Sequence, residues 1–503
     1  MRYAGKIPGA LLVWVISYLF FLSTLVTNFS ASHDSIHYLI DILNNQHLFH
    51  EHHLLYHFLA NKWMHLMHVV FPGIDEHFLI ESFTSLWGSS ALCMVWLFLR
   101  NRFNLLAAPA AAGTAVVCFS YGFWFYSVNI EVYLPPLFFV LCCLYILTGK
   151  NFRAGDVWKI AILHSLAILF HQVNVLFAPV IIYVFFANRL PLKYWLQYMA
   201  IGTIITLGTY FIAGWIIEKH HSFPEWIRWM QGYTVGHGYW QPLSMKTPLH
   251  VITGFVHAFI GGHFIFQLPA MEHYLQNSFQ THGLNDEVFL SDKMSYFTAR
   301  ALTGLFVIYS VVFVFLSVRF FANYKKIRSQ FGVVVSPLLL CIVVYSVFFC
   351  FWMPEILEFW ILQMVLVWIL LIGTLPVLKL PFKVPMGKGL ILLAVIMFSI
   401  NYFGSIRWLQ DLSNDWYYAQ VDKIRHGLTS EDVVIVKDEW ILKDFIHQYT
   451  PVLVIADDEE GYNKNNADES IRRAIQNGKK VYLYKPPSGP AGSFGSWELI
   501  RSY

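Results

Sequence analysis

The stretch SHDSIHYLIDILNNQHLFHEHHLLY, between Ser32 and Tyr56, concentrates side chains that could exchange protons or bind an anion. Asp34, His37 and Asp41 are spaced i, i+3 and i+7, so on a helix they would share one face. The same spacing recurs at His50, His53 and His57. We interpret this segment as part of an active site at the external surface of a membrane. The alternative is an interfacial helix whose histidines meet only lipid headgroups.

The composition predicts an integral membrane protein. Of 503 residues, 57% are hydrophobic and only 13% are charged, whereas about a quarter are charged in soluble domains. The net charge of +3 is small for this length, so we expect no nucleic-acid partner. All six cysteines lie in apolar stretches, which favours buried thiols over disulfides or zinc ligands.

Apolar windows of about 20 residues, some of them shorter, predict eleven membrane spans. The windows lie near residues 9–28, 78–99, 104–124, 132–149, 157–170, 174–188, 194–217, 297–320, 332–352, 357–377 and 389–406. Short cytoplasmic loops are enriched in Lys and Arg. Such residues recur at every second boundary: Arg2 and Lys6, Arg100 and Arg102, Lys150 and Arg153, Arg189 and Lys193, Lys325, Lys326 and Arg328, and Lys379, Lys383 and Lys388. The alternation predicts a cytoplasmic N-terminus and an external C-terminus, in a periplasm or an organelle lumen.

Residues 1–410 are therefore predicted to form an all-α, multi-span domain with two large external loops. The first loop, residues 30–77, contains the ionisable segment and is the expected catalytic loop. The second loop, residues 218–296, contains one more apolar run, Val251–Phe266. A full span there would move every later basic loop to the other side. We therefore expect this run to re-enter the membrane or to lie on its surface.

Residues 411–503 read as a small α/β domain outside the membrane. Short apolar runs at residues 432–436, 451–456 and 480–484 predict buried strands, and they alternate with helical patterns at 440–449 and 469–477. Strands that alternate with helices indicate a small parallel α/β unit. The tail has no glycine-rich phosphate-binding motif, so we predict no nucleotide.

Further acids and one histidine are predicted to lie at the same external boundary. Glu131 follows the third span, Glu355 and Glu358 open the tenth, and His171 lies in a turn between two spans. Any one of these groups could reach water and be structural. Because they come from different spans, their convergence predicts a polar, outward-facing cleft.

Several short patterns resemble membrane glycosyltransferases of the GT-C class. They are HDSIHYLIDIL, HEHHLLYHFL, NIEVYLPPLFF, LFHQVNVLFAP and MPEILEFWI. Together they are most similar to DUF2723 and the TMEM260-like protein O-mannosyltransferases, along most of the chain. One departure concerns the motif H-P-P-G-Y-P of that family: here His50, Glu51, His52, His53, Leu54 and Leu55 stand in its place. Because of this departure, the resemblance does not determine the subfamily or the identity of the sugar.

The resemblance implies an inverting transfer of a sugar, mannose by family, from a polyprenyl phosphate to a hydroxyl acceptor on a protein or on the cell envelope. A phosphate leaves as a weakly basic anion, so one carboxylate acting as general base suffices, unlike the two carboxyls of glycosidases. Asp34 is the expected base, and Glu131 is the second catalytic candidate. The departing phosphate needs positive charge or hydrogen-bond donors. The candidates for that role are His52, His53, His171, Arg228 and Arg300, while Glu355 and Glu358 could bind substrate hydroxyls.

We expect no cofactor and no metal, although Asp34, Glu131 and a histidine are ligands that would suit Mg²⁺ or Mn²⁺. The expected partners are the lipid-linked sugar, its acceptor and membrane lipid. The expected location is a bacterial inner membrane, with the active site and the C-terminal domain on the periplasmic or luminal side.

Each interpretation has a structural alternative. Asp34 could cap a helix, and Glu131 could pair with a histidine or with a helix end. Glu355 and Glu358 could be interfacial anchors, and His171 could be a hydrogen-bonded core residue. For the whole chain, the rivals are a transporter or flippase of lipid-linked sugars and a structural membrane subunit. The spans carry few charges at mid-membrane depth, which favours the enzyme.

Overall fold

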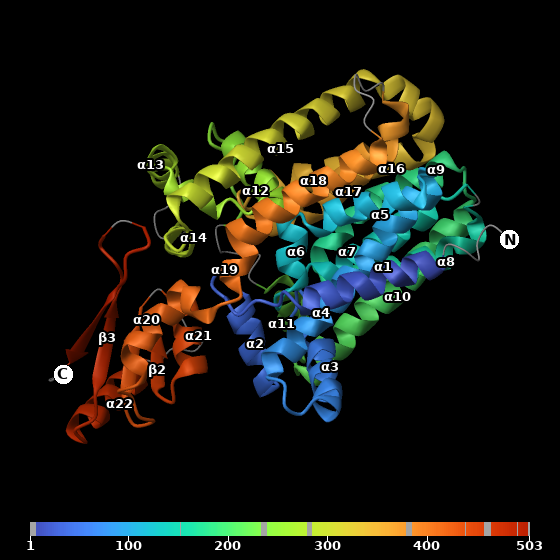
Figure 1. The fold of residues 1–503 in the computed structure, drawn as a ribbon. Helices are drawn as coiled ribbons and strands as arrows, with labels where there is room; N and C mark the ends of the chain where they lie inside the picture. Colours follow the sequence, from blue (N-terminus) through green and yellow to red (C-terminus); the bar gives the residue numbers. More distant parts are fainter. Residues whose placement is uncertain are drawn as a thin grey trace. The chain divides into compact units, whose positions relative to one another are not determined.

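The structure is a computed structural model that packs as two compact units (Figure 1). It describes residues 7–150, 152–232, 239–278, 284–378, 385–437, 439–456, 464–489 and 491–500. The first unit comprises Met1–Leu25, Asn45–Gly261 and Gly304–Asn401, and the second comprises Val26–Asn44, Gly262–Thr303 and Tyr402–Tyr503. Four residues of the predicted basic loops lie outside the described residues: Arg2, Lys6, Lys379 and Lys383.

The first unit is a bundle of helices. Its α-helices are α1 (Ile7–Leu22), α3 (Tyr56–Val70), α4 (Glu76–Leu97), α5 (Ala107–Cys118), α6 (Tyr121–Ser127), α7 (Leu134–Leu147), α8 (Val157–Phe170), α9 (Ala178–Ala187), α10 (Leu192–Tyr210), α11 (Phe223–Gln231), α12 (Thr247–Phe259), α16 (Tyr324–Phe349), α17 (Ile361–Thr374) and α18 (Met386–Asn401). Its shorter 3-10 and π segments include η1 (Phe98–Arg102), η3 (Gln172–Phe177), η4 (Phe211–Ile217) and η8 (Leu357–Trp360). α15 (Tyr296–Ala322) begins in the second unit and ends in the first.

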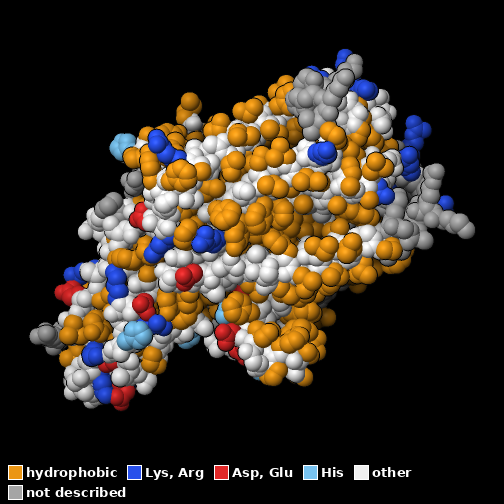
Figure 2. Space-filling view, viewed as in Figure 1, with side chains coloured by type: hydrophobic (Ala, Val, Ile, Leu, Met, Phe, Trp, Pro, Cys, Tyr) orange, Lys and Arg blue, Asp and Glu red, His pale blue; other side chains and the backbone are white. Residues whose placement is uncertain are grey.

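The bundle is that of an integral, multi-pass membrane protein. Figure 1 shows its long helices running side by side, and α4 packs against both α1 and α7. α17 is buried on nearly every side, whereas α10 and α15 expose apolar side chains along most of their length. Figure 2 shows hydrophobic side chains over much of one face of the molecule. Exposed apolar surface of this extent suits contact with lipid tails.

Each of the eleven predicted windows overlaps a helix, but the helices differ in length. Among the described residues, six helices are long and apolar enough to cross a membrane, or seven if α5 and α6, which are bent by 75°, form one span. Three shorter apolar helices are Pro8–Leu22, Leu134–Leu147 and Gln172–Ala187. The fold class is confirmed, and the number of spans stays a prediction.

Two of the predicted basic turns meet at one end of the bundle. The Arg102 guanidinium lies over the Tyr145 ring, 4.0 Å from its centroid, and donates a hydrogen bond to the Tyr145 carbonyl near the end of α7. The turns after α4 and after α7 therefore lie together, as their shared basic character predicts. The side of the membrane on which they lie stays a prediction.

The apolar run Val251–Phe266 does not form one continuous helix. α12 has 13 residues and ends at Phe259, and the chain then continues through an extended Ile260. A helix of this length covers about 20 Å, against about 30 Å for the hydrocarbon core of a bilayer. α12 is therefore too short to span, while its re-entrant or interfacial placement stays a prediction.

The second unit combines short helices with one sheet. The helices are α2 (Ser35–Asn44), α13 (Pro269–Ser278), α14 (Asn285–Ser291), α19 (Arg407–Leu409), α20 (Trp416–Arg425), α21 (Trp440–Tyr449) and α22 (Lys464–Gln476), with η6 (His263–Gln267), η10 (Tyr402–Ile406) and η11 (Leu412–Asn414). The strands are β1 (Val433–Val436), β2 (Leu453–Ala456), β3 (Val481–Lys485) and β4 (Ser496–Ile500), in the order β2-β1-β3-β4.

The sheet is mixed rather than wholly parallel. β1 pairs in parallel with β2 and β3, as the alternation of strands and helices predicts, and Val433 stands opposite both Leu453 and Val481. β4 was not predicted, and it pairs antiparallel to β3. β4 is an edge strand with both faces partly exposed, so its sequence, SWELI, lacks the apolar run by which buried strands are recognised.

Asp415 ties the first loop of the chain to the last hundred residues. One oxygen of its carboxylate accepts hydrogen bonds from the backbone N–H groups of Phe29 (2.9 Å) and Ser30 (3.0 Å). The other oxygen accepts from the N–H of Tyr418 and so caps α20. Burial nevertheless raises the pKa of Asp415 to about 6. The segment that leads to α2 is thus part of the same compact unit as α20.

We expect Asp415→Ala to destabilise the second unit by roughly 2 kcal/mol or more, because it leaves two buried N–H groups and the partly buried N–H of Tyr418 without their acceptor. Thermal unfolding and limited proteolysis of the full chain would measure the effect. The matched control is Asp422→Ala on the same helix, since Asp422 is exposed and pairs with Arg425 and His426 at the surface. Equal stability of the two variants would contradict the anchoring role of Asp415.

Candidate active site

Asp34 lies directly before α2 in the second unit. Its side chain is half-buried, and its Oδ2 accepts a hydrogen bond of 3.3 Å from the Tyr38 hydroxyl, one turn further along. Its backbone carbonyl accepts from the Tyr38 N–H. Burial raises the pKa of Asp34 above its ordinary value near 3.8, against the opposing effects of His33, Tyr38 and His37. The structure therefore presents a carboxylate that binds a proton more readily than a free aspartate.

Of the predicted helical face of Asp34, His37 and Asp41, the last two lie on α2, whereas Asp34 precedes the helix. His37 Nε2 lies 3.6 Å from Asp41 Oδ2. The other ring nitrogen, Nδ1, lies 3.1 Å from Oδ2 of Asp444 on α21. The imidazole thus lies between two carboxylates from distant parts of the sequence.

In the first unit, the histidine segment is fastened to the turn after α8. The His52 carbonyl accepts a hydrogen bond from the Gln172 N–H, and His52 Nδ1 lies 3.2 Å from Gln172 Oε1. The Gln172 amide group also donates to the carbonyls of Glu51 and Met230. One glutamine side chain therefore connects the histidine segment with the C-terminal end of α11.

The structure brings together three of the predicted phosphate-binding residues, His52, His53 and His171. The centroids of the His53 and His171 rings lie 4.7 Å apart, and His50 stacks on His53 at 5.1 Å. Burial is the largest cause of a lowered pKa at all three histidines. The pKa is about 4 for His52, about 3 for His171 and well below the ordinary value for His53. At neutral pH these imidazoles are therefore uncharged, and they could offer hydrogen bonds but no positive charge.

Gly232 closes on the same segment from the end of α11. Its backbone adopts φ +48° and ψ −140°, which L-residues rarely do. A β-carbon at this position would collide with the side chains of Glu51 and His52. The close contact between α11 and the histidine segment thus depends on glycine.

A chain of aromatic and polar side chains leads from His171 to Glu358. The Tyr133 ring lies 5.2 Å from the His171 ring, and its hydroxyl donates a 2.5 Å hydrogen bond to Glu358 Oε1. Tyr126 donates to the other oxygen of the same carboxylate at 2.9 Å. Glu358 thus accepts hydrogen bonds from two tyrosines within the bundle.

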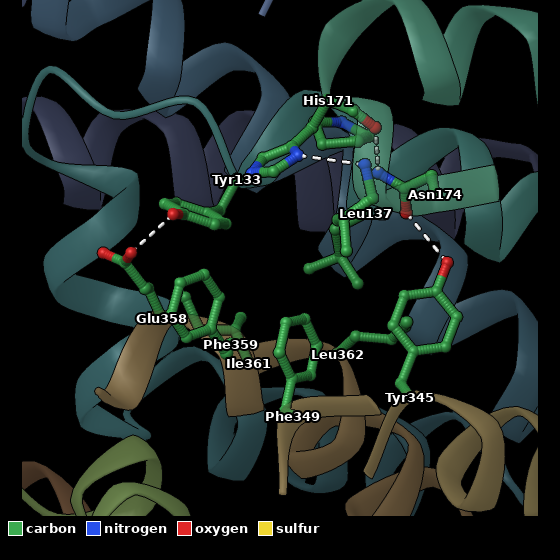
Figure 3. A pocket seen from close by; sticks show the side chains of 12 residues that line it. Tyr133, Leu137, His171, Asn174, Tyr345, Phe349, Glu358, Phe359, Ile361 and Leu362 are labelled. Carbon is green, nitrogen blue, oxygen red and sulfur yellow. Dashed lines mark hydrogen bonds between the residues drawn. The ribbon is translucent and has the colours of Figure 1, made fainter. Parts of the chain in front are cut away.

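Figure 3 shows Tyr133, His171, Asn174, Tyr345 and Glu358 around one small cavity. The Asn174 side chain donates to the His171 carbonyl and accepts from the Tyr345 hydroxyl. The cavity measures about 40 Å³, against roughly 300 Å³ at the lower end of pockets for drug-sized ligands. In this conformation it has room for water but not for a sugar.

Glu131 is fully buried in the link between α6 and α7. Tyr126, which donates a hydrogen bond to Glu358, also lies within electrostatic range of Glu131, as does Tyr56. Glu81 on α4 also acts on Tyr56. The predicted outward-facing cleft with Glu131, Glu355, Glu358 and His171 stays a prediction.

The other predicted site residues lie elsewhere in their units. Glu355 Oε2 lies 3.6 Å from His250 Nδ1, and Glu355 Oε1 accepts a hydrogen bond from the Gln241 side chain. Arg228 is exposed in the last turn of α11, and Arg300 lies over the Tyr296 ring at the start of α15. Their part in binding substrate stays a prediction.

The described residues contain no group of three or more His, Cys, Asp or Glu side chains arranged to hold a metal ion. The five rings of His50, His52, His53, His57 and His171 contact one another by their faces and edges. Such a cluster stacks the imidazoles rather than directing their nitrogens at one point.

Sequence reasoning missed Tyr126, Tyr133, Gln172 and Asp444 as parts of these clusters. Tyr133 follows Glu131 by two residues in NIEVYLPP, and its proximity to an expected site acid was a usable signal. Asp444 had no such signal, because it lies 407 positions from His37.

Comparison with known proteins identifies structural relatives only. No protein-family model matches the chain, and no curated protein sequence matches it significantly. ArnT from Cupriavidus metallidurans bound to undecaprenyl phosphate superposes with a TM-score of 0.50 at 13% identity, over 96% of this chain and 92% of that chain. ArnT from the same organism in the apo state gives 0.46 at 13% identity, over 97% and 94%.

At this identity, the likeness to lipid-bound ArnT shows the fold alone. The chain has an ArnT-like fold of the GT-C type, as the sequence predicted: a mostly helical membrane domain followed by a small domain with a sheet. The narrower resemblance to DUF2723 and the TMEM260-like proteins stays a prediction.

We expect Glu358→Gln to lower the stability of the first unit by about 1–3 kcal/mol, because the new amide group cannot accept the hydrogen bond of the second tyrosine. Thermal unfolding in detergent would measure the effect. Tyr126→Phe removes one donor, so its effect and that of Glu358→Gln should be clearly non-additive in the double variant. Additive effects would contradict the shared carboxylate.

Gly232→Ala should loosen the contact between α11 and the histidine segment. We expect a loss of at least roughly 1–2 kcal/mol from the backbone conformation alone, with the collision at Glu51 and His52 in addition. Gly208→Ala in α10 is the matched control, since the space around Gly208 is open and an alanine suits a helix. The melting temperatures of the two variants provide the comparison, and equal values would refute the steric role of Gly232.

Proposed function

We propose that this chain is a membrane glycosyltransferase that moves a sugar from a polyprenyl-phosphate donor to a hydroxyl acceptor, with inversion at the anomeric carbon. The single observation that carries this proposal is Asp34, a half-buried carboxylate with a raised pKa in the first loop of a GT-C-type fold. The resemblance to GT-C glycosyltransferases implies the role of general base for the same residue.

The donor class is supported by the fold. The solved structure that superposes on 96% of the chain is that of ArnT bound to undecaprenyl phosphate. A lipid-linked donor also suits a protein whose helices expose long apolar faces, because the prenyl tail can remain in the bilayer. Mannose as the sugar follows from the resemblance to O-mannosyltransferases.

Asp34 would remove the proton of the acceptor hydroxyl as that oxygen attacks the anomeric carbon. A general base is most effective when its pKa lies near the working pH while its charged form still predominates. Burial shifts Asp34 in that direction, and the Tyr38 hydroxyl bond fixes one oxygen of its carboxylate. The other oxygen is then available to the acceptor.

The departing phosphate would be received by hydrogen bonds first. The buried, neutral imidazoles of His52, His53 and His171 offer N–H donors. An arriving phosphate would favour their protonation, because a nearby anion stabilises the charged form of an imidazole. Arg228 and Arg300 carry a permanent charge and are the alternative phosphate ligands.

We place the reaction at the periplasmic or luminal face, on a secreted protein or a cell-envelope glycan as acceptor. This placement follows from the alternation of basic loops along the sequence. A bacterial inner membrane is the corresponding location. Glu131 remains the second catalytic candidate, and Glu355 and Glu358 remain the candidates for binding sugar or acceptor hydroxyls.

Asp34→Asn should lower turnover of a radiolabelled polyprenyl-phosphate sugar by about 10²–10⁴-fold, the usual contribution of a general base. The measurement uses purified full-length protein and a panel of lipid-linked sugars that begins with mannose. Asp422→Asn, at an exposed position, is the matched control. Wild-type turnover in Asp34→Asn would remove Asp34 from the role of base, and donor transport across vesicles without turnover would favour a flippase.

The pH profile gives a second test of Asp34. Only the deprotonated carboxylate accepts a proton, so kcat/KM should fall as the pH falls through the pKa of Asp34. That pKa is raised above 3.8 by burial, so the acid limb should lie above the range of an exposed aspartate. An acid limb at or below 3.8 would contradict the buried setting of the base.

A further inference from the structure

The imidazole of His37 connects the helix that follows Asp34 with the C-terminal domain. Its ring lies within 4 Å of carboxylates on both sides, Asp41 on α2 and Asp444 on α21. The edge of the Trp440 ring also faces it, with the ring centroids 6.5 Å apart. These contacts lie where α2 packs along α21.

α21 is itself firmly held. Its inner face buries Leu442, Phe445 and Ile446, and the ring of Tyr417 on α20 stacks on Phe445. Asp444 belongs to the same helix and is also buried. The contact with Asp444 therefore attaches His37 to a helix that is packed in a core rather than to a loop.

The charges at this contact require a cation. The side chains of Asp41 and Asp444 are only 4% and 8% exposed, whereas that of His37 is 42% exposed. Two buried carboxylates on either side of one ring each lose part of their hydration, which is costly without an opposite charge. The imidazolium offsets both, and these carboxylates, together with Asp34, raise the pKa of His37 against the opposing effect of burial.

We propose that His37 and Asp444 are positioning residues for Asp34: by joining α2 to α21, they make the C-terminal domain the support that sets the place of the catalytic carboxylate. This inference rests on the proposed function. Asp34 precedes α2 by one residue, and its Oδ2 is bonded to Tyr38, the residue after His37. A shift of α2 would therefore move the base itself.

The support should weaken as the pH rises. The folded-state pKa of His37 lies above its ordinary value of 6.5, so the charged contact is fully present below about 6.5 and is lost as the pH rises through the raised value. The charged groups that act on the ring are Asp34 and Asp41 from its own segment and Asp444 from α21. All three are acids, so each favours the protonated ring.

The test uses the full chain in nanodiscs and two readouts. Hydrogen exchange of the α2 amides, corrected for the intrinsic effect of pH, reports the contact without any substrate. Turnover of a lipid-linked sugar reports the placement of Asp34. The variants are His37→Gln and Asp444→Asn, which break the contact, and His37→Lys, which keeps a cation that does not titrate in this range. His447→Gln, on the exposed side of α21, is the matched control.

We expect His37→Gln and Asp444→Asn to speed exchange in α2 by about 10-fold or more, since each loses a hydrogen bond to a charged group. We also expect them to lower kcat by about 10- to 100-fold, as a displaced catalytic group does, with KM for the donor little changed. His37→Lys should restore both readouts and abolish the loosening of α2 at high pH. His447→Gln should match the wild type.

Unchanged exchange in α2 of His37→Gln and Asp444→Asn would overturn the contact itself. Faster exchange with wild-type kcat at every pH would overturn the positioning of Asp34. If the wild-type protein turns over no lipid-linked sugar, the proposed function fails, while the exchange data still decide whether the C-terminal domain supports α2. Failure of His37→Lys to restore exchange would contradict the need for a cation.

Discussion

Two carboxylates near the end of the chain hold the segment that carries Asp34. Asp415 accepts the backbone N–H groups of Phe29 and Ser30, 386 and 385 residues away, and Asp444 holds His37 across 407 residues. The helix of this segment, α2, has only ten residues, and isolated helices of that length are not stable in water, so it depends on such tertiary contacts. The geometry of the proposed base is therefore a property of the C-terminal domain as much as of the first loop.

The first unit follows a second constraint, which is that polar groups inside an apolar bundle must satisfy one another. Tyr126 and Tyr133 both donate to Glu358, and Gln172 bonds to His52, Glu51 and Met230. Burial keeps the histidines uncharged, so the cluster tolerates its apolar surroundings without a counter-ion. It is a preorganised set of donors and acceptors rather than a fixed charge.

Much of this fold could be predicted from the sequence, because the patterns that indicate its helices and strands extend over short stretches of the chain. Apolar windows and strand–helix alternation are such patterns, and they predicted the helical multi-span bundle, the three strands β1 to β3 and the helix α21. The GT-C type of the fold was implied by the family resemblance. The i, i+4 spacing on α2 likewise predicted the His37–Asp41 contact. Span number was harder, because α1, α7 and α9 are short and the α5–α6 pair is bent.

What sequence reasoning could not reach depends on long-range packing. Asp444 and Asp415 look like ordinary surface acids in their own surroundings, and only the folded chain brings them to the first loop. β4 is likewise recognisable only beside β3. The neutrality of His52 and His171 is a consequence of burial, whereas the sequence left positive charge and hydrogen-bond donation both open for them.

The central claim, that a single displacement at the anomeric carbon is assisted by one base, is tested most directly by the stereochemistry of the released sugar. A polyprenyl-phosphate sugar of known anomeric configuration would be incubated with the purified protein, with water or a simple alcohol as acceptor, and the new anomer read by NMR before it equilibrates. The account predicts the inverted configuration. Retention would exclude a single inverting displacement and would contradict the role given to Asp34.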